Sequence, residues 1–286
     1  MEVTKTMTLR ESNHFLTNLI KKDKPFTVLR LGSVESTIAL SVVLKKNINM
    51  HDIFVLGRNA GIYCRGPQDI IKYGNLYNLA IKNADGLSCF EDLCASQQNI
   101  YIKKHKIPAL NFKVIEPFYS ILENIVPWSY YLKDKRILII NPFVDSFKEQ
   151  QHNNFKIFKN KNIFHPNQKF IFYKAYNTAA GNHLHSSWLQ TFNIMCNDIE
   201  KIDFDIALLG CGGYGLPLCN FIKTYLNKSA IYIGGGLQLL FGVMGKRWEN
   251  TDLWKKIIKE NDCKFIRPNN HEKIQNSNTI EGGCYW

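Results

Sequence analysis

Residues 205–247 constrain the fold more than any other part of the chain. A strand pattern, Asp205–Leu209, leads into the glycine-rich string LGCGGYGLP and a helical pattern, and a second strand, Ala230–Ile233, ends in three consecutive glycines. Strands that alternate with helices form parallel βαβ units, in which helices cover both faces of an open sheet. The stretch therefore predicts an α/β fold with a Rossmann-like, mostly parallel sheet.

The same alternation extends over the rest of the chain. Helical spacing covers residues 8–22, begins again near Glu35 and returns at 69–83, whereas apolar β-branched runs predict strands at 26–31, 108–115, 136–140 and 169–173. We expect a single domain over residues 1–286. If it has two lobes, their boundary is expected near residues 127–135, where a proline and a charged cluster interrupt the pattern.

Hydropathy and cysteine usage indicate a cytoplasmic protein without a membrane span. The most apolar segment, Ile206–Ile222, is interrupted by four glycines and a proline, whereas a membrane helix needs roughly 20 apolar residues. The N-terminus lacks the apolar core of a signal peptide. None of the eight cysteines forms a CxxC pair, so we expect reduced thiols in the core rather than a zinc site.

The formal net charge of +12 raises the question of a nucleic-acid partner. Lysines are scattered in short groups along the chain, and no basic helix, zinc-finger or RNP pattern collects them. We therefore expect no nucleic-acid partner, and the charge is sufficiently explained by attraction of a smaller anion or by solvated surface lysines.

The first loop that could carry chemistry follows the strand Asp205–Leu209 and matches GxGxxG. Its residues are Gly210, Gly212, Gly213, Tyr214 and Gly215. Glycine lets backbone amides approach a phosphate closely, and the helix N-terminus adds a partial positive charge there. The alternative is that these glycines serve only the close packing of strand and helix.

The next strand ends in glycines rather than in an acidic residue. A dinucleotide site would place an aspartate or glutamate there to hold the ribose, but the chain has Gly234 and Gly235, with Gln238 just beyond. NAD and FAD are therefore disfavoured, no haem is expected, and the absence of a GKS or GKT string argues against an ATPase. A methyltransferase is disfavoured for the same missing acid. The glycines predict either a second close approach of backbone to ligand or simply a tight turn.

The strand at residues 26–31 leads into another candidate loop. Arg30, Gly32, Ser33 and Glu35 lie at this strand-to-helix turn, where the guanidinium could hold a phosphate and the carboxylate a cation or a ribose. The alternative is structural: Ser33 caps the helix and Glu35 lies in its first turn.

Two further loops add candidates. Lys246, Arg247 and Trp248 could grip a diphosphate or stack on a sugar or base. Asp145 follows the strand at residues 136–140, where it or Ser146 could cap the next helix. The candidate general bases are Glu35, Asp145, Glu249 and Glu281, together with one of the histidines 183 and 185.

Several of these strings together resemble one family. LRLGSVES resembles the RxGxGE turn of GT-D-type glycosyltransferases, and DFDIALLGCGGYGLPL, IYIGGGLQLLFGVMGKRW and EGGCYW resemble relatives in bacterial and large-virus sugar clusters. The resemblance covers residues 26–286. It implies a GT-D-like sheet, a nucleotide-diphosphate sugar donor that is typically uridine-linked, transfer of a sugar such as xylose, and a glycan or glycoprotein acceptor. For a viral member it implies the host cytoplasm.

The family also implies a divalent cation, Mn²⁺ or Mg²⁺, held by a D-x-E motif. Here that motif reads Ser33-Val34-Glu35, which leaves Glu35 as the metal ligand and puts metal dependence in question. Binding of the diphosphate by Arg30, Lys246 or Arg247 without a metal is the alternative. The rival function is a non-catalytic protein that binds a nucleotide sugar or a carbohydrate.

Overall fold

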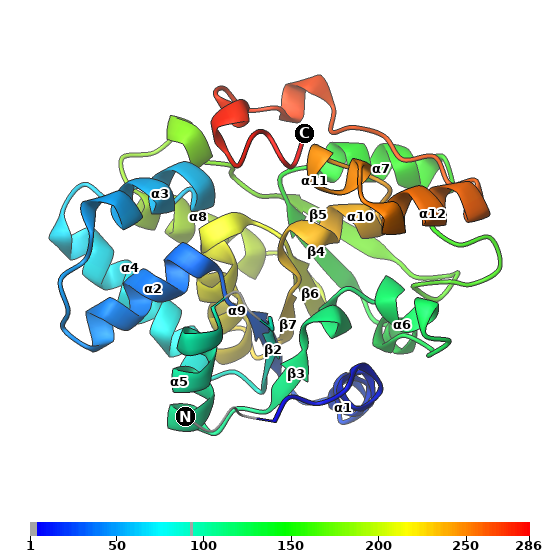
Figure 1. Cartoon of the computed structure of the whole chain (residues 1–286), viewed down its shortest axis with the longest axis horizontal. Helices are drawn as coiled ribbons and strands as arrows, with labels where there is room; N and C mark the ends of the chain where they lie inside the picture. Colours follow the sequence, from blue (N-terminus) through cyan, green and yellow to red (C-terminus); the bar gives the residue numbers. More distant parts are fainter. Residues whose placement is uncertain (1–4, 92–93) are drawn as a thin grey trace.

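The computed structural model describes residues 5–91 and 94–286. Its strands form one seven-stranded sheet (Figure 1). Every strand pair is parallel, and the strand order is β3-β2-β1-β7-β6-β4-β5. The strands are β1 (Thr27–Arg30), β2 (Gly86–Cys89), β3 (Ala109–Asn111), β4 (Ile137–Asn141), β5 (Phe170–Lys174), β6 (Ile206–Leu209) and β7 (Ser229–Tyr232). The Rossmann-like α/β fold predicted from the sequence is confirmed.

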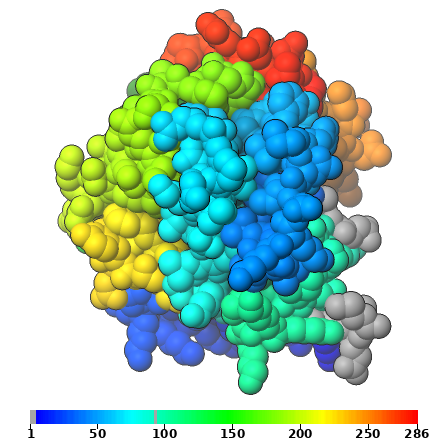
Figure 2. All heavy atoms as spheres, turned by 90° about the vertical axis from the view of Figure 1, so that its left-hand side faces the viewer, coloured from blue at the N-terminus to red at the C-terminus, as the bar shows by residue number. Residues whose placement is uncertain are grey.

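Helices cover both faces of the sheet (Figure 1). One face carries α2 (Ser33–Val43), α3 (Met50–Ala60), α4 (Pro67–Lys82), α5 (Ala95–His105), α8 (Trp188–Glu200) and α9 (Gly215–Thr224). The other carries α1 (Leu9–Lys21), α6 (Phe118–Leu122), α7 (Val144–His152), α10 (Leu237–Leu240) and α12 (Asp252–Asn261), and α11 (Lys246–Glu249) lies beyond the strand ends. Figure 2 shows the first face, where α2 and α3 (blue) lie beside α4 (cyan).

The central strands are apolar throughout because both of their faces are buried. Along β6, Leu208 joins the core under α1, α7 and α12, whereas Leu209 joins the core under α4, α8 and α9. Ile139 and Ile140 alternate in the same way along β4. Parallel strands covered on both faces are expected to have continuous apolar sequences. For this reason the central strands could be predicted from the sequence.

The first and last strands of the chain are neighbours in the sheet. Thr27 of β1 lies opposite Ala230 of β7, and Val28 lies opposite Ile231. The chain leaves β1 toward α2 on one face and leaves β7 toward α10 on the other. A crevice opens at such a switch point, outside the carboxyl ends of the strands.

Most predicted elements are present with small shifts at their ends. The helix at residues 8–22 is α1, which starts with a capping box between Thr8 and Glu11. The strand predicted over 108–115 is shorter: after β3 the chain turns into the 3₁₀ helix Phe112–Ile115, where Asn111 caps the turn. Helix α3 and strand β2 were not predicted.

Two helix caps that the sequence left open as alternatives are absent. Ser33 is the first residue of α2, whose N-cap is Gly32 without a side-chain hydrogen bond. At α7 the N-cap is Phe143, and the amides of Asp145 and Ser146 instead donate to the carboxylate of Glu272, 2.9 and 3.3 Å away. The cap of α7 is thus supplied from a distant part of the chain, which local sequence cannot reveal.

Residues 127–135 hold the 3₁₀ helix Trp128–Leu132, which packs against α1. Strands from both sides of this segment join the same sheet. Among the residues described, no helix is both long and apolar enough to cross a bilayer.

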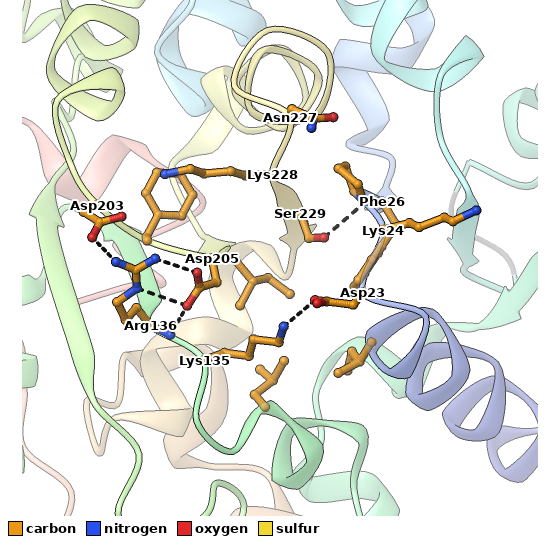
Figure 3. A pocket seen from close by; sticks show the side chains of 15 residues that line it. Asp23, Lys24, Phe26, Lys135, Arg136, Asp203, Asp205, Asn227, Lys228 and Ser229 are labelled. Atoms are coloured by element: carbon orange, nitrogen blue, oxygen red, sulfur yellow. Dashed lines mark hydrogen bonds and ion pairs between the residues drawn. The ribbon is translucent and has the colours of Figure 1, made fainter.

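An ion-pair cluster ties the starts of β4 and β6 together at the amino end of the sheet (Figure 3). The guanidinium of Arg136 donates to Asp205 at 2.7 and 3.2 Å and also pairs with Asp203, and the backbone amide of Arg136 donates to Asp205 at 2.7 Å. These hydrogen bonds from Arg136 lower the pKa of Asp205.

We expect Asp205→Asn to reduce the free energy of unfolding by about 1 kcal/mol at neutral pH, because the ion pair is about a third to a half exposed. A carboxylate whose pKa falls on folding contributes stability above its unfolded pKa of about 3.9, and that stability is lost as pH falls through the folded pKa. The melting temperatures of wild type and variant should therefore differ at pH 7 and approach each other as the pH falls below about 3.9. The control is Asp134→Asn, at an exposed aspartate without an ion pair to a described residue. If the melting temperatures of wild type and Asp205→Asn still differ by the same amount at low pH, the ion pair is not the source of the stability.

Candidate functional site

A cleft of about 620 Å³ lies over the carboxyl ends of β1, β7, β6 and β4. Its floor comes from the turns after these strands, one wall from α3, and another wall from α11 and residues 280–285. In Figure 1 the carboxyl ends of these strands point upward, and the red C-terminal segment lies above them. The cleft thus occupies the switch point between β1 and β7, where ligands of open parallel sheets bind.

Arg30, the last residue of β1, extends into this cleft beside the glycine turn after β7. Its Nη1 lies 3.1 Å from Oε1 of Glu116, and its guanidinium lies over the ring of Phe90 at 5.3 Å. Burial raises the pKa of the Glu116 carboxyl, and Arg30 opposes this shift. One hydrogen bond to Glu116 uses one of the five guanidinium N–H donors, so other donors remain for a ligand.

Arg247 enters the cleft from α11 with a similar set of neighbours. Its guanidinium lies over the ring of Tyr285 at 4.7 Å and donates to the tyrosine hydroxyl at 3.3 Å. It also forms an ion pair with Glu281. The side chain amide of Gln238 donates to the carbonyl of Tyr285 at 3.3 Å, so the segment that carries Glu281 and Tyr285 is fastened against α10 and α11.

The turn Gly234–Gly236 brings these two groups together because each glycine lies against a side chain that lines the cleft. A Cβ on Gly234 would lie 2.4 Å from Nη2 of Arg30, and one on Gly235 would lie 2.7 Å from the ring of Tyr285. Gly234 also has φ +73°, where side chains are strained. The turn after β7 is thus closely packed by protein side chains, and approach of its backbone to a ligand stays a prediction.

The predicted glycine loop after β6 is packed chiefly against the protein itself. A Cβ would lie 2.5 Å from the carbonyl oxygen of residue 234 at Gly210, 2.4 Å from Ile62 at Gly213 and 2.0 Å from the Tyr232 ring at Gly215. Hydroxyls of two tyrosines, 232 and 73, donate to the carbonyls of residues 212 and 213 at 3.0 and 3.2 Å. The geometry thus favours the packing alternative for Gly210, Gly213 and Gly215, whereas residue 212 is exposed in the cleft.

Glu35, in the first turn of α2, lines the same cleft. Its carboxylate lies over Gly32, where a Cβ would come within 2.5 Å of both carboxylate oxygens. Burial raises the pKa of Glu35, and the negative charge of Glu281 raises it further. Within the described chain no cation pairs with Glu35. It is therefore the cleft carboxylate that is available to accept a proton.

The cleft brings most of the predicted site residues together. Those that line it are Arg30, Gly32, Ser33, Glu35, Gly210, Gly212, Tyr214, Gly234, Gly235, Gln238, Arg247 and Trp248, and Glu281 joins them. Those outside the lining are Gly213, Gly215, Lys246, Asp145 and Glu249.

The two outlying carboxylates are engaged elsewhere. Asp145 lies 2.5 Å from Nζ of Lys174 and 3.1 Å from Nε2 of His271, and the hydrogen bond from Lys174 lowers its pKa. Glu249 forms an ion pair with Arg267. The depressed pKa makes Asp145 a poor proton acceptor, and Glu249 lies outside the cleft. This geometry therefore favours Glu35 among the candidate bases.

The same region contains the cluster Asp145, His271 and Glu272, whose ligand atoms lie within 4.8 Å of one another. Its oxygens already have partners, because Glu272 accepts from the amides that start α7 and from the hydroxyl of Ser146, and Asp145 is neutralised by Lys174. These contacts explain the cluster as a helix cap with an ion pair, without a metal.

Sequence reasoning missed several residues of the cleft. Glu116 and the stacked rings of Phe90 and Phe112, with centroids 6.2 Å apart, all follow the carboxyl ends of β2 and β3. Their position after strands was a usable signal, but β2 itself was not predicted. His183 lies outside the lining and stacks on Tyr63, with ring centroids 3.8 Å apart.

A second cavity, of about 280 Å³, lies at the opposite, amino end of the sheet (Figure 3). Its charged side chains largely neutralise one another through the Arg136 cluster and through Lys135 with Asp23, and Lys228 lies over the Phe204 ring at 4.2 Å. The carboxyl-end cleft is therefore the better candidate. Comparisons of the chain with protein-family models, curated proteins and solved structures found no match.

Proposed function

We propose that the chain is a glycosyltransferase that moves a sugar from a nucleotide-diphosphate donor, uridine-linked, to a hydroxyl of a glycan or glycoprotein acceptor. The observation that carries this proposal is the convergence of two guanidiniums, Arg30 and Arg247, on the glycine turn at the switch point. Planar guanidiniums present paired donors that match phosphate oxygens. The aromatic rings around them offer faces for a base or a sugar.

In this proposal the arginines stabilise the leaving group. The bond between the anomeric carbon and the diphosphate oxygen breaks, and the diphosphate leaves with the bonding electrons. Hydrogen-bond donors fixed around the oxygens where this charge develops lower the barrier, because they need no reorganisation during the reaction. To bind both phosphates, Arg30 and Arg247 must share their donors between the diphosphate and their present partners, Glu116 and Glu281.

Glu35 is the proposed general base. It takes the proton of the acceptor hydroxyl as that oxygen bonds to the anomeric carbon, so a single base suffices for an inverting transfer. Burial and the charge of Glu281 raise the pKa of Glu35, and a raised pKa makes a carboxylate a stronger base.

The cleft does not fit a dedicated divalent-cation site. Mg²⁺ and Mn²⁺ need several oxygen ligands, but Glu116 and Glu281 are held by arginines, and Ser33 stands where the resembling family has its aspartate. We therefore propose binding of the diphosphate by arginines without a metal ion. The rival, a non-catalytic nucleotide-sugar binder, is favoured by the same serine and would show binding without turnover.

We expect one uridine-diphosphate sugar to stabilise the protein in a thermal-shift screen. A ligand at 100 times its dissociation constant adds roughly 2.7 kcal/mol to the free energy of unfolding. The shift should be the same with Mn²⁺, Mg²⁺ or a chelator. Absence of a shift and of sugar transfer for every donor would refute the function, whereas a shift that needs a metal would refute only the metal-free binding.

Arg247→Gln should weaken donor binding by about 10- to 100-fold, the value of a charged hydrogen bond to phosphate. Glu281 is already about half exposed, so water can solvate its carboxylate when the arginine is removed. The variant should therefore still fold. Calorimetry with the donor measures the effect. Arg65→Gln serves as the control, since Arg65 is a surface arginine outside the cleft. Unchanged affinity in Arg247→Gln, or an equal loss in both, would refute the proposed contact.

Glu35→Gln should lower the rate of transfer by about 10²- to 10⁴-fold and leave donor affinity unchanged. In the wild type the rate should rise with pH through the raised pKa of Glu35, because only the ionised carboxylate accepts a proton; the variant should lose this dependence. Glu249→Gln, at a carboxylate outside the cleft, is the matched control. Full activity in Glu35→Gln would eliminate this residue as the base.

A further inference from the structure

Four large apolar side chains are exposed on the hairpin formed by α2 and α3, two at the end of α2 and two on the first turns of α3. Val43 is 37%, Leu44 46%, Met50 75% and Phe54 61% exposed. We call these four residues the hairpin patch. Figure 2 shows the surface of this hairpin in blue, on the side of the molecule away from the central sheet.

The patch is separate from the side of α3 that serves the core. Leu56 and Ala60 are buried, whereas Met50 and Phe54 are one turn apart on the exposed side. An isolated exposed apolar residue is ordinary, but several of them on one helical hairpin mark a candidate interaction surface. The fold itself therefore does not explain these side chains.

Positive charges accompany the patch. Lys45 and Lys46 are exposed in the turn between the two helices, and the guanidinium of Arg58 lies over the Phe54 ring at 5.3 Å. Asp52 is the one acidic residue between positions 43 and 58, and the whole chain carries a net charge of +12. Apolar side chains bordered by lysine and arginine are the pattern by which helices lie on anionic lipid surfaces.

We propose that the hairpin patch docks the protein on the anionic surface of a lipid bilayer. Val43, Leu44, Met50 and Phe54 enter the headgroup region, and the three cations lie against lipid phosphates and carboxylates. A second copy of the chain fits less well, since a two-fold contact through this patch would bring the lysines of both copies together.

Docking would also orient the cleft. Helix α3 contributes Val55, Asn59 and Ala60 to the cleft wall, so the same helix would contact the bilayer and border the candidate site. If the proposed transfer is correct, this favours an acceptor carried at a membrane surface. The docking itself does not rest on the transfer activity and is tested without it.

The test is co-flotation of the full chain with vesicles. Wild type should bind vesicles of phosphatidylcholine with phosphatidylserine, weakly at high salt, and should not bind phosphatidylcholine alone. The double variant Met50→Ser/Phe54→Ser should bind at least about tenfold more weakly. In Lys45→Gln/Lys46→Gln, each replaced lysine should lower the affinity for anionic vesicles roughly fivefold.

The matched control is Leu184→Ser/Tyr225→Ser, which removes side chains of 72% and 68% exposure outside the hairpin and should bind like wild type. Thermal melts of all variants check the fold. The proposal is overturned if wild type does not bind anionic vesicles, or if the control variant loses as much binding as the hairpin variants. It is also overturned if light scattering shows a dimer that the hairpin variants abolish.

Discussion

The pairing of β1 with β7 is the constraint on which the candidate site depends. It places the first strand of the chain beside the last, and the chain leaves the two strands toward opposite faces of the sheet. Arg30 at the end of β1 therefore meets the glycine turn after β7, and the segment that follows α12 folds back to add Glu281 and Tyr285. Groups separated by most of the sequence thus share one cleft because two short strands share hydrogen bonds.

Close packing at the strand ends explains why glycines gather there. The carbonyl of Gly234 occupies the space where Gly210 would place a Cβ, and the ring of Tyr232 does the same at Gly215. The turns after β6 and β7 consequently interlock, and the side chains above them have a fixed floor. In a glycine motif that resembles a phosphate loop, most of the glycines can therefore be required by contacts within the protein. Here the groups suited to an anion are arginines from other elements.

The sequence predicted the fold well because periodicity is a local property. Central strands buried on both faces read as apolar runs, and α1, α2 and α4 have helical spacing. Strand β2 has only four residues, Gly86–Cys89, and lacks a β-branched run. Arg30, Glu35 and Arg247 could be selected because they lie at a strand end, in the helix turn after it, or beyond a glycine turn. The partners that determine their chemistry, Glu116 and Tyr285, are set by tertiary contacts, as is the Glu272 cap of α7.

The charge balance of the cleft links its candidate chemistry to its architecture. Arg30 and Arg247 face Glu35, Glu116 and Glu281, so the carboxylates outnumber the guanidiniums when all are ionised. Burial raises the pKa of both Glu35 and Glu116, and arginine opposes that shift only at Glu116. Desolvation disfavours the charged form of each carboxyl, but only Glu35 lacks a cation among the residues described. An anionic ligand would add negative charge near the same groups and so favour protonation at Glu35. In the transfer that we propose, the proton of the acceptor hydroxyl would therefore have a nearby site whose affinity for it increases when the anionic donor is bound.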